Sequence, residues 1–212
     1  MEDIRLEGRV GRLGLVMTAV VVDGQGGKEY RLSTPEELNA ASSAANQVPK
    51  TFADIPFGLP TARLPSKEAL GFRVPLYGFD QWHKLFTPRQ LVALGTISRV
   101  IRSLPQPTDV DAADADLAAG VRMLLGCAMD RQADYSSMLC LWALGEFVCH
   151  TFTRFALPIT WDFVESNPIG GTSGNFDGAV DWVARFVDHL LEMKPSDIES
   201  KVLNISALEY PD

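Results

Sequence analysis

The fold is organised around one helix start, Phe86-Thr87-Pro88-Arg89-Gln90-Leu91. Thr87 is a helix-capping residue type, Pro88 suits the first helical position, and Gln90 is placed to close a capping box. Apolar residues then recur with a helical period until two prolines interrupt the pattern. They are Leu91, Leu94, Ile97, Ile101 and Leu104, followed by Pro105 and Pro107. We therefore predict a helix that begins at Pro88 and ends before Pro105.

Further helical patterns make residues 79–195 a predicted helical region. Short helical segments are expected over residues 79–85 and 161–165. One long helix is predicted from about Val110 to Ala133, with acidic residues near its start, where the helix dipole favours them. Its apolar face carries Leu117, Val121, Leu124, Leu125 and Ala128. A last helix should run from Phe176 to Pro195, with Val180, Val183, Val187, Leu190 and Leu191 as its buried stripe.

Residues 1–46 are predicted to form a β-hairpin followed by a helix. The hairpin spans residues 8–32, because an apolar, partly β-branched run (10–22) precedes the turn signal Asp23-Gly24-Gln25-Gly26-Gly27 and a short alternating strand. The stretch Thr34-Pro35-Glu36-Glu37 supplies a cap, a first-turn proline and a capping box for the helix. This helix should fade near Asn46.

Residues 47–78 are predicted to be an extended connector without helices, laid over the surface of the next unit. The reason is their proline content, since proline interrupts helices and central strands. The prolines are Pro49, Pro56, Pro60, Pro65 and Pro75. This connector is also the best candidate for an internal boundary.

A short strand, Lys201-Val202-Leu203-Asn204-Ile205, is predicted near the end of the sequence. The complete prediction is an α+β fold, mainly α, with an N-terminal β-hairpin, a helical bundle and this terminal strand. A buried-type strand without a following helix is half of an α/β unit, so we expect the chain to be a fragment.

The net charge of −8 has the wrong sign for a stand-alone DNA-binding protein, which needs basic surface. The sequence has no apolar run long enough for a membrane span and no signal-peptide pattern, so we expect a cytoplasmic chain without membrane contact. Cys127, Cys140 and Cys149 form no CxxC pair, which predicts free thiols, each acting as a small buried hydrophobe, and no zinc site.

No motif for catalysis or metal binding occurs, since HExxH, GxSxG and a phosphate loop behind a strand are all missing. The run Thr172-Ser173-Gly174-Asn175 is interpreted as a helix cap, with anion binding as the alternative. Arg131 and Asp134 stand at helical spacing, which is typical of a structural ion pair. Four basic residues are candidates for phosphate contact with DNA, with a solvated surface as the alternative. They are Lys84, Arg89, Arg99 and Arg102.

Four stretches, in this order and spacing, resemble one protein family. They are Tyr77-Gly78-Phe79-Asp80-Gln81-Trp82-His83-Lys84-Leu85-Phe86-Thr87-Pro88-Arg89-Gln90-Leu91, Asp130-Arg131-Gln132-Ala133-Asp134-Tyr135-Ser136-Ser137-Met138-Leu139-Cys140, Leu157-Pro158-Ile159-Thr160-Trp161-Asp162-Phe163-Val164-Glu165-Ser166-Asn167-Pro168 and Ser173-Gly174-Asn175-Phe176-Asp177-Gly178-Ala179. The family is that of the large bacterial and archaeal adenine-specific DNA methylases that carry a zinc ribbon. The resemblance extends over roughly residues 8–212.

The resemblance implies an internal fragment of an S-adenosylmethionine-dependent adenine-N6 methyltransferase. The cofactor-binding glycine motif lies upstream in that family, and the catalytic Asp/Asn-Pro-Pro-Tyr motif lies downstream. Residues 196–212 would then belong to a truncated, Rossmann-like methyltransferase core, with Ser206 and Ala207 near the cofactor's adenine. We expect no tight cofactor binding by this chain, and as partners DNA, through the parent protein, and the remainder of the methyltransferase.

The resemblance also suggests how residues 79–195 could function. Tyr135, Trp161 and Asn167 are candidates for base stacking or for lining a DNA cleft, with burial in the core as the alternative for the aromatic residues. The region would be a DNA-recognition, lid or support region without activity of its own. A non-catalytic helical protein-interaction module is the alternative.

Overall fold

The computed structural model describes residues 2–153 and 156–193, and these form a mainly helical α+β fold. This confirms the predicted fold class. The helices are α1 (Glu2–Arg9), α2 (Pro35–Ser43), α3 (Val48–Phe52), α4 (Lys67–Leu70), α5 (Pro88–Ser103), α6 (Ala112–Asp134) and α7 (Phe176–Glu192). Short 3-10 helices are η1 (Ala44–Asn46), η2 (Val74–Tyr77), η3 (Trp82–Leu85), η4 (Pro107–Asp109) and η5 (Thr151–Thr153). The predicted strand 201–205 lies outside the described residues, as do Ser206 and Ala207.

Two capping boxes start their helices where the sequence predicts. At α5, Thr87 Oγ1 accepts a hydrogen bond from the Gln90 backbone N–H (3.3 Å), and the Thr87 N–H donates to Gln90 Oε1 (2.8 Å). At α2, Thr34 and Glu37 make the same two bonds, at 3.3 and 2.8 Å. The predicted end of α5 is confirmed as well, because α5 ends at Ser103 before Pro105. The end predicted near Asn46 is not, because α2 ends at Ser43 and the backbone stays helical through η1 and Gln47 into α3.

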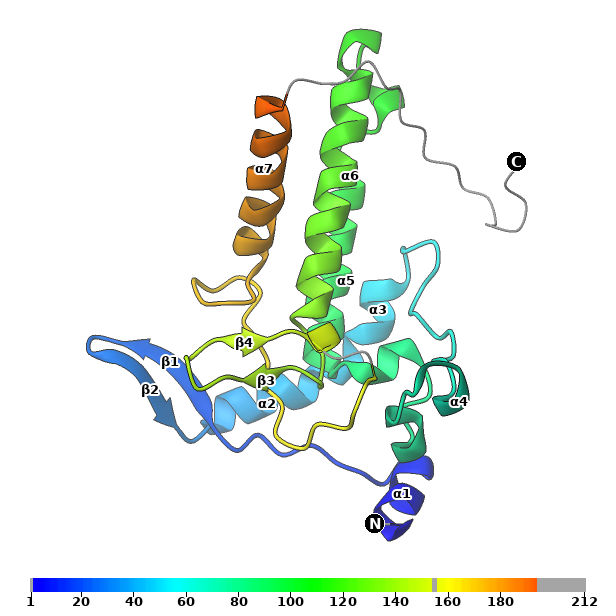
Figure 1. Ribbon diagram of the computed structural model, residues 1–212, viewed down its shortest axis with the longest axis vertical. Helices are drawn as coiled ribbons and strands as arrows, with labels where there is room; N and C mark the ends of the chain where they lie inside the picture. The colour runs from blue at the N-terminus through cyan, green and yellow to red at the C-terminus, as the bar shows by residue number, and fades with distance from the viewer. Residues whose placement is uncertain (1, 154–155, 194–212) are drawn as a thin grey trace.

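Helices α5, α6 and α7 form the long part of the molecule, with α6 between the other two (Figure 1). Near the lower end of the bundle, α6 and α7 share a small core of Ala128, Ala179 and Val183, bordered by Leu124, Phe176 and Val180. Toward the other end of the bundle, apolar side chains of α6 and α7 are exposed. Leu190 and Leu191 of α7 are 47% and 78% exposed, so the prediction that they belong to a buried stripe is wrong.

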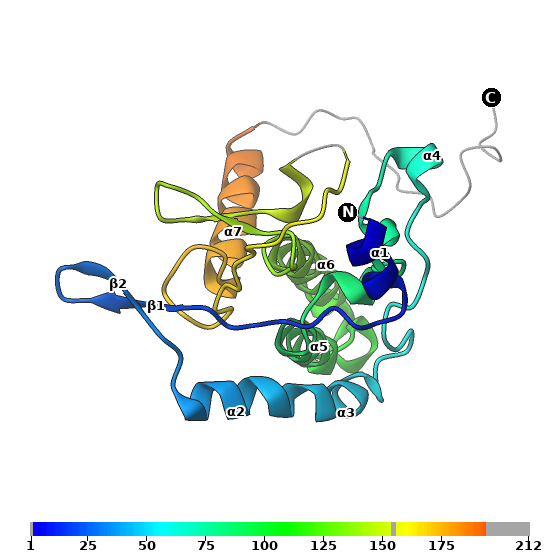
Figure 2. The ribbon, with the colours of Figure 1, turned by 90° about the horizontal axis from the view of Figure 1, so that it is seen from below.

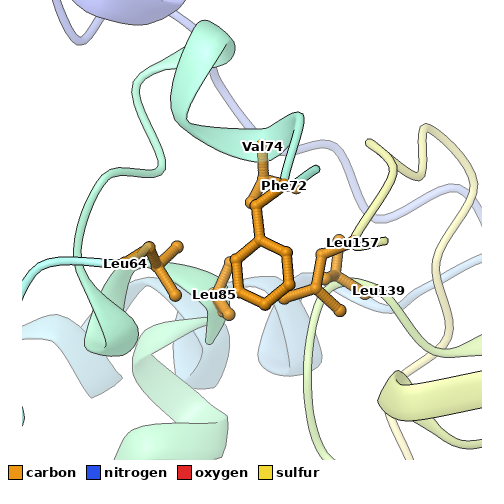
Figure 3. Close-up of a cluster of buried hydrophobic side chains, with 6 residues drawn as sticks. All are labelled: Leu64, Phe72, Val74, Leu85, Leu139 and Leu157. Carbon is orange, nitrogen blue, oxygen red and sulfur yellow. The ribbon is translucent and has the colours of Figure 1, made fainter. Parts of the chain in front are cut away.

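The main core lies below the helical bundle and gathers six buried side chains from distant parts of the chain (Figure 3). They are Leu64, Phe72, Val74, Leu85, Leu139 and Leu157. Half of this cluster comes from the predicted connector, residues 47–78, which is therefore part of the core rather than a layer over the surface. The expectation that the connector holds no helix is also wrong. Pro49 and Pro75 stand in the first turns of α3 and η2, where the missing N–H of proline costs no helical hydrogen bond.

The predicted hairpin is shorter than expected. Strand β1 (Val20–Gly24) pairs antiparallel with β2 (Gly27–Arg31) around a two-residue turn, which confirms the glycine-rich stretch as a turn. Gly8 and Arg9, within the predicted hairpin, belong to helix α1 instead, and residues 12–19 have no regular structure. In the view of Figure 2, the irregular segment that leads to β1 passes across the ends of α5 and α6.

A second hairpin, which the sequence analysis did not predict, lies next to the bundle. Strand β3 (Leu141–Trp142) pairs with β4 (Val148–Cys149). The helical segment predicted over residues 161–165 is wrong, because this segment is non-helical and its Val164 N–H donates to the carbonyl of Cys140, just before β3 (3.0 Å). Among the described helices, none is both long enough and apolar enough to cross a membrane.

Candidate functional site

The four stretches that carry the resemblance meet in one place, which we call the junction (residues 77–91, 130–140, 157–168 and 173–179). Hydrogen bonds connect the second stretch to each of the other three. They run from Met138 N to Leu85 O (2.8 Å), from Val164 N to Cys140 O (3.0 Å), from Ser166 Oγ to Tyr135 O (3.1 Å) and from Gln132 Nε2 to Gly174 O (2.8 Å). The junction is thus a product of tertiary folding.

A buried polar cluster forms the centre of the junction. Ser137 Oγ lies 2.7 Å from Thr151 Oγ1 and accepts a hydrogen bond from the Leu139 N–H (3.0 Å). Thr151 in turn donates to the carbonyl of Asp134 (2.6 Å). Cys140 Sγ lies 3.7 Å from Thr151 Oγ1, and burial raises the pKa of the Cys140 thiol. A thiol with a raised pKa stays protonated at neutral pH, so this cluster holds the fold together and supplies no nucleophile.

Asp134 binds partners on the loop after β4 rather than on its own helix. Its carboxylate lies 2.9 Å from His150 Nδ1 and accepts a hydrogen bond from the Phe152 N–H (3.0 Å). The His150 ring stacks at a tilt on Tyr135, with 5.5 Å between the ring centroids. The predicted Arg131–Asp134 ion pair is absent from the described residues, because the Asp134 carboxylate contacts these loop residues instead.

The candidates for base stacking occupy different positions. Tyr135 ends α6 inside the junction, and Asn167 is an exposed turn residue whose side chain accepts a hydrogen bond from the Ile169 N–H (3.1 Å). Trp161 is 56% exposed and lies edge-on to Tyr77, with 5.7 Å between the centroids. The structure therefore brings Tyr135 and Asn167 into neighbouring loops, and it places Trp161 with a different partner.

An apolar cavity of about 90 Å³ lies beside Trp161. Its walls include Phe79, Met138 and Phe163, and the segment Leu13-Gly14-Leu15 borders it. An engineered apolar cavity of about 150 Å³ admits benzene. The cavity beside Trp161 is smaller than this.

Three of the four candidate DNA contacts are occupied by acidic partners. Lys84 Nζ lies 2.5 Å from Asp80 Oδ1, and this hydrogen bond lowers the pKa of the Asp80 carboxyl. Arg89 makes a two-bond contact with Glu165, and Arg99 lies 3.5 Å from Asp54. Arg102 is exposed and has no ion-pair partner in the described part of the chain. Lys84 of η3 and Arg89, Arg99 and Arg102 of α5 therefore do not present four free cations to a phosphate backbone.

Arg131 and Trp182 form a contact that the sequence analysis missed. The Arg131 guanidinium carbon lies 5.1 Å from the Tyr135 ring centroid and 4.5 Å from that of Trp182. The spacing of Arg131 and Tyr135 along one helix allows the first contact to be expected. The second could not be found from sequence, because Trp182 belongs to α7 and reaches Arg131 only when α7 packs on α6.

The cysteines and acidic residues that the structure describes are not arranged as a metal site. Within the described ranges, no group of three or more His, Cys, Asp and Glu side chains is arranged to hold a metal ion. The three cysteines are free, which confirms that prediction. Cys140 is buried, whereas Cys127 is exposed, so the expected burial of every cysteine is wrong for Cys127.

Comparison with known proteins adds no further assignment. No family model, no curated protein and no solved structure matches this chain. The functional interpretation therefore depends on the residues of the junction and their contacts.

Proposed function

We propose that this chain is a non-catalytic support or lid region of an S-adenosylmethionine-dependent adenine-N6 DNA methyltransferase. The junction is the observation that supports this proposal. Its four stretches resemble the methylase family, are separated in sequence, and bind one another in the folded chain. Their meeting in one hydrogen-bonded unit gives these separated stretches a common structural role.

Within this proposal, a support role for the region around α5 agrees better with the contacts than direct reading of DNA by Lys84, Arg89 and Arg99. The polar groups of the junction bind each other, and Lys84, Arg89 and Arg99 are engaged by acidic side chains. The net charge of −8 also opposes approach to phosphates. Base methylation needs the target amino group held in line with the methyl donor. The 212 residues contain no Asp/Asn-Pro-Pro-Tyr motif, so another polypeptide segment must hold that group.

A protein-interaction module is the second candidate, and the open ends of α6 and α7 favour it. Several large apolar side chains on these helices are exposed in the described structure. They are Leu117, Val121, Met123, Trp182, Phe186, Leu190 and Leu191. Exposed apolar groups in such number are typical of surfaces that other polypeptides cover. This module would bind a partner without taking part in methylation.

Methyl transfer separates the two candidates. The purified chain is incubated with tritiated S-adenosylmethionine and adenine-rich duplex DNA, alone and together with the polypeptide encoded beside it that carries an Asp/Asn-Pro-Pro-Tyr motif. We expect no incorporation by the chain alone and incorporation by the mixture beyond that of the motif-bearing polypeptide alone. Incorporation by the chain alone, or no such motif encoded nearby, would contradict the proposal. Binding of the motif-bearing polypeptide without any gain in methylation would favour the interaction module.

A further inference from the structure

Arg131 contacts two aromatic rings and has no acidic partner among the described residues. Its guanidinium lies over the rings of Tyr135 and Trp182, at 5.1 and 4.5 Å from their centroids. The N–H groups of a guanidinium lie in its plane, where they form a fork suited to two oxygens of one anion. The helices fix this geometry in advance, which lowers the entropy cost of binding.

Arg131 shares the lack of an acidic partner with Arg102 and Arg185 among the described residues, and it differs from them in contacting two aromatic rings. The chain has 27 acidic and 19 basic residues, and Arg12, Arg31, Arg89 and Arg99 all have acidic partners. Asp134, three residues after Arg131, binds His150 instead. The guanidinium edge is thus free to bind a ligand, although the exposed Asp130 and Asp181 beside the site limit the affinity for an anion.

Trp182 adds an aromatic surface next to this cation. Its side chain is 53% exposed, although it contacts Arg131. Arg185 lies three residues further along α7, on the adjacent helical turn, and is also exposed without an ion-pair partner in the described structure. An anion-binding fork beside an open indole matches a nucleotide, whose phosphate would bind the guanidinium while its base stacks on the ring.

We infer that Arg131 and Trp182 form a contact site for one nucleotide of an unpaired DNA strand, with Arg131 on the phosphate and Trp182 under the base. This inference deepens the proposed function and rests on it, because it places the DNA contact on the seam between α6 and α7 rather than on α5. A duplex keeps its bases stacked inside, so the site should prefer single-stranded DNA.

The test is fluorescence anisotropy of a labelled oligothymidylate of about 12 nucleotides, titrated with the full 212-residue chain. We expect Arg131→Ala and Trp182→Ala each to weaken binding at least about fivefold. Arg131→Lys keeps the charge but loses the planar fork, so it should restore only part of the affinity. Arg102→Ala is the matched control, since Arg102 is exposed and unpaired in the described residues, and should leave the affinity unchanged.

Trp182→Phe covers the case in which the alanine variant does not fold, because phenylalanine keeps an aromatic wall for Arg131. Binding should quench the tryptophan fluorescence of the original chain, and this quench should disappear in Trp182→Phe. Lack of binding by the original chain, equal loss in Arg102→Ala, or an unchanged quench in Trp182→Phe would overturn the inference. Failure of the proposed function would give a different result. The mixture of this chain with the motif-bearing polypeptide would bind oligothymidylate but transfer no methyl groups.

Discussion

Arg89 and Glu165 join two stretches that lie 76 residues apart, through hydrogen bonds of 3.0 Å from Arg89 Nε and 2.8 Å from Arg89 NH2. Arg89 stands in the first turn of α5, and Glu165 lies in the non-helical segment that the sequence analysis predicted to be helical. The contact holds this segment against the helix start around which the fold is organised. It also removes Arg89 from the set of free cations on α5.

Breaking this pair should destabilise the chain modestly. We expect Arg89→Met and Glu165→Gln each to lower the free energy of unfolding by about 1 kcal/mol, because the contact is bidentate but partly exposed. A double-mutant cycle from urea denaturation should give a coupling energy of similar size that decreases at high salt. Strict additivity of the two substitutions would show that the pair contributes nothing.

The capping box of α5 should matter more than that of α2. Thr87→Ala removes a buried cap and should cost about 1 kcal/mol of unfolding free energy. Thr34→Ala removes the same bond from α2, which buries no side chain, and should mainly increase hydrogen exchange within that helix. Thermal denaturation and amide exchange of both variants check this difference. Equal loss of global stability in the two would contradict it.

A leucine of the main core and a leucine at the exposed end of α7 should differ strongly in their contribution to stability. Leu157 is fully buried in the main core, so Leu157→Ala should cost about 2–5 kcal/mol. Leu191→Ala, at a site 78% exposed, should change stability by less than about 0.5 kcal/mol. Urea denaturation of the isolated chain measures both. A large cost at Leu191 would mean that the end of α7 is packed after all.

The cysteines should react in the order of their exposure. An aromatic disulfide reagent should modify the exposed Cys127 in the native chain, whereas Cys140 should react only after unfolding. Burial raises the pKa of the Cys140 thiol, which lowers its thiolate fraction at any given pH. Cys127→Ser should remove the fast phase of the reaction. Rapid native-state modification that persists in Cys127→Ser, traced by mass spectrometry to Cys140, would refute this order.

The hairpin–α2 contact should depend on pH through Glu37. The hydrogen bond from Arg31 lowers the pKa of Glu37 from its usual 4.5 to about 2, with help from the Thr34 N–H. A carboxyl whose pKa is lower in the folded state than in the unfolded state stabilises the folded state at pH values above the unfolded-state pKa. This contribution is lost as the pH falls toward 2. The difference in Tm between the original chain and Arg31→Met should therefore shrink from pH 5 to pH 2. A difference that stays constant over this range would contradict the assignment.

The elements that the sequence predicted well are those decided by neighbouring residues. The starts of α2 and α5 follow from Thr34 with Glu37 and from Thr87 with Gln90, and each pair is only three residues apart. The helix over residues 112–134 and the start of α7 at Phe176 are predictable for the same reason. In these cases caps and helical periodicity operate within a few turns, so no distant partner can change the outcome.

The connector was misread because proline density was weighed without regard to position. Pro49 and Pro75 interrupt nothing, since each stands in the first turn of a short helix. Leu64, Phe72 and Val74 then turn inward to meet Leu139 and Leu157. No local pattern indicates this burial, because Leu139 and Leu157 lie at least 65 residues further along the chain (139 − 74).

The candidate site also has features that local sequence determines and features that only tertiary packing determines. The sequence alone determined which residue types are available, including the stretches of the junction, the first-turn caps and the excess of acidic groups. Only the tertiary structure decided how they are used: Arg89 binds Glu165, Asp134 binds His150, and Arg131 contacts Tyr135 and Trp182. A cap is a bond between near neighbours, and the chain can specify it locally. Whether a charge is paired or left free depends on which distant segment packs beside it, and that is settled only when the whole core forms.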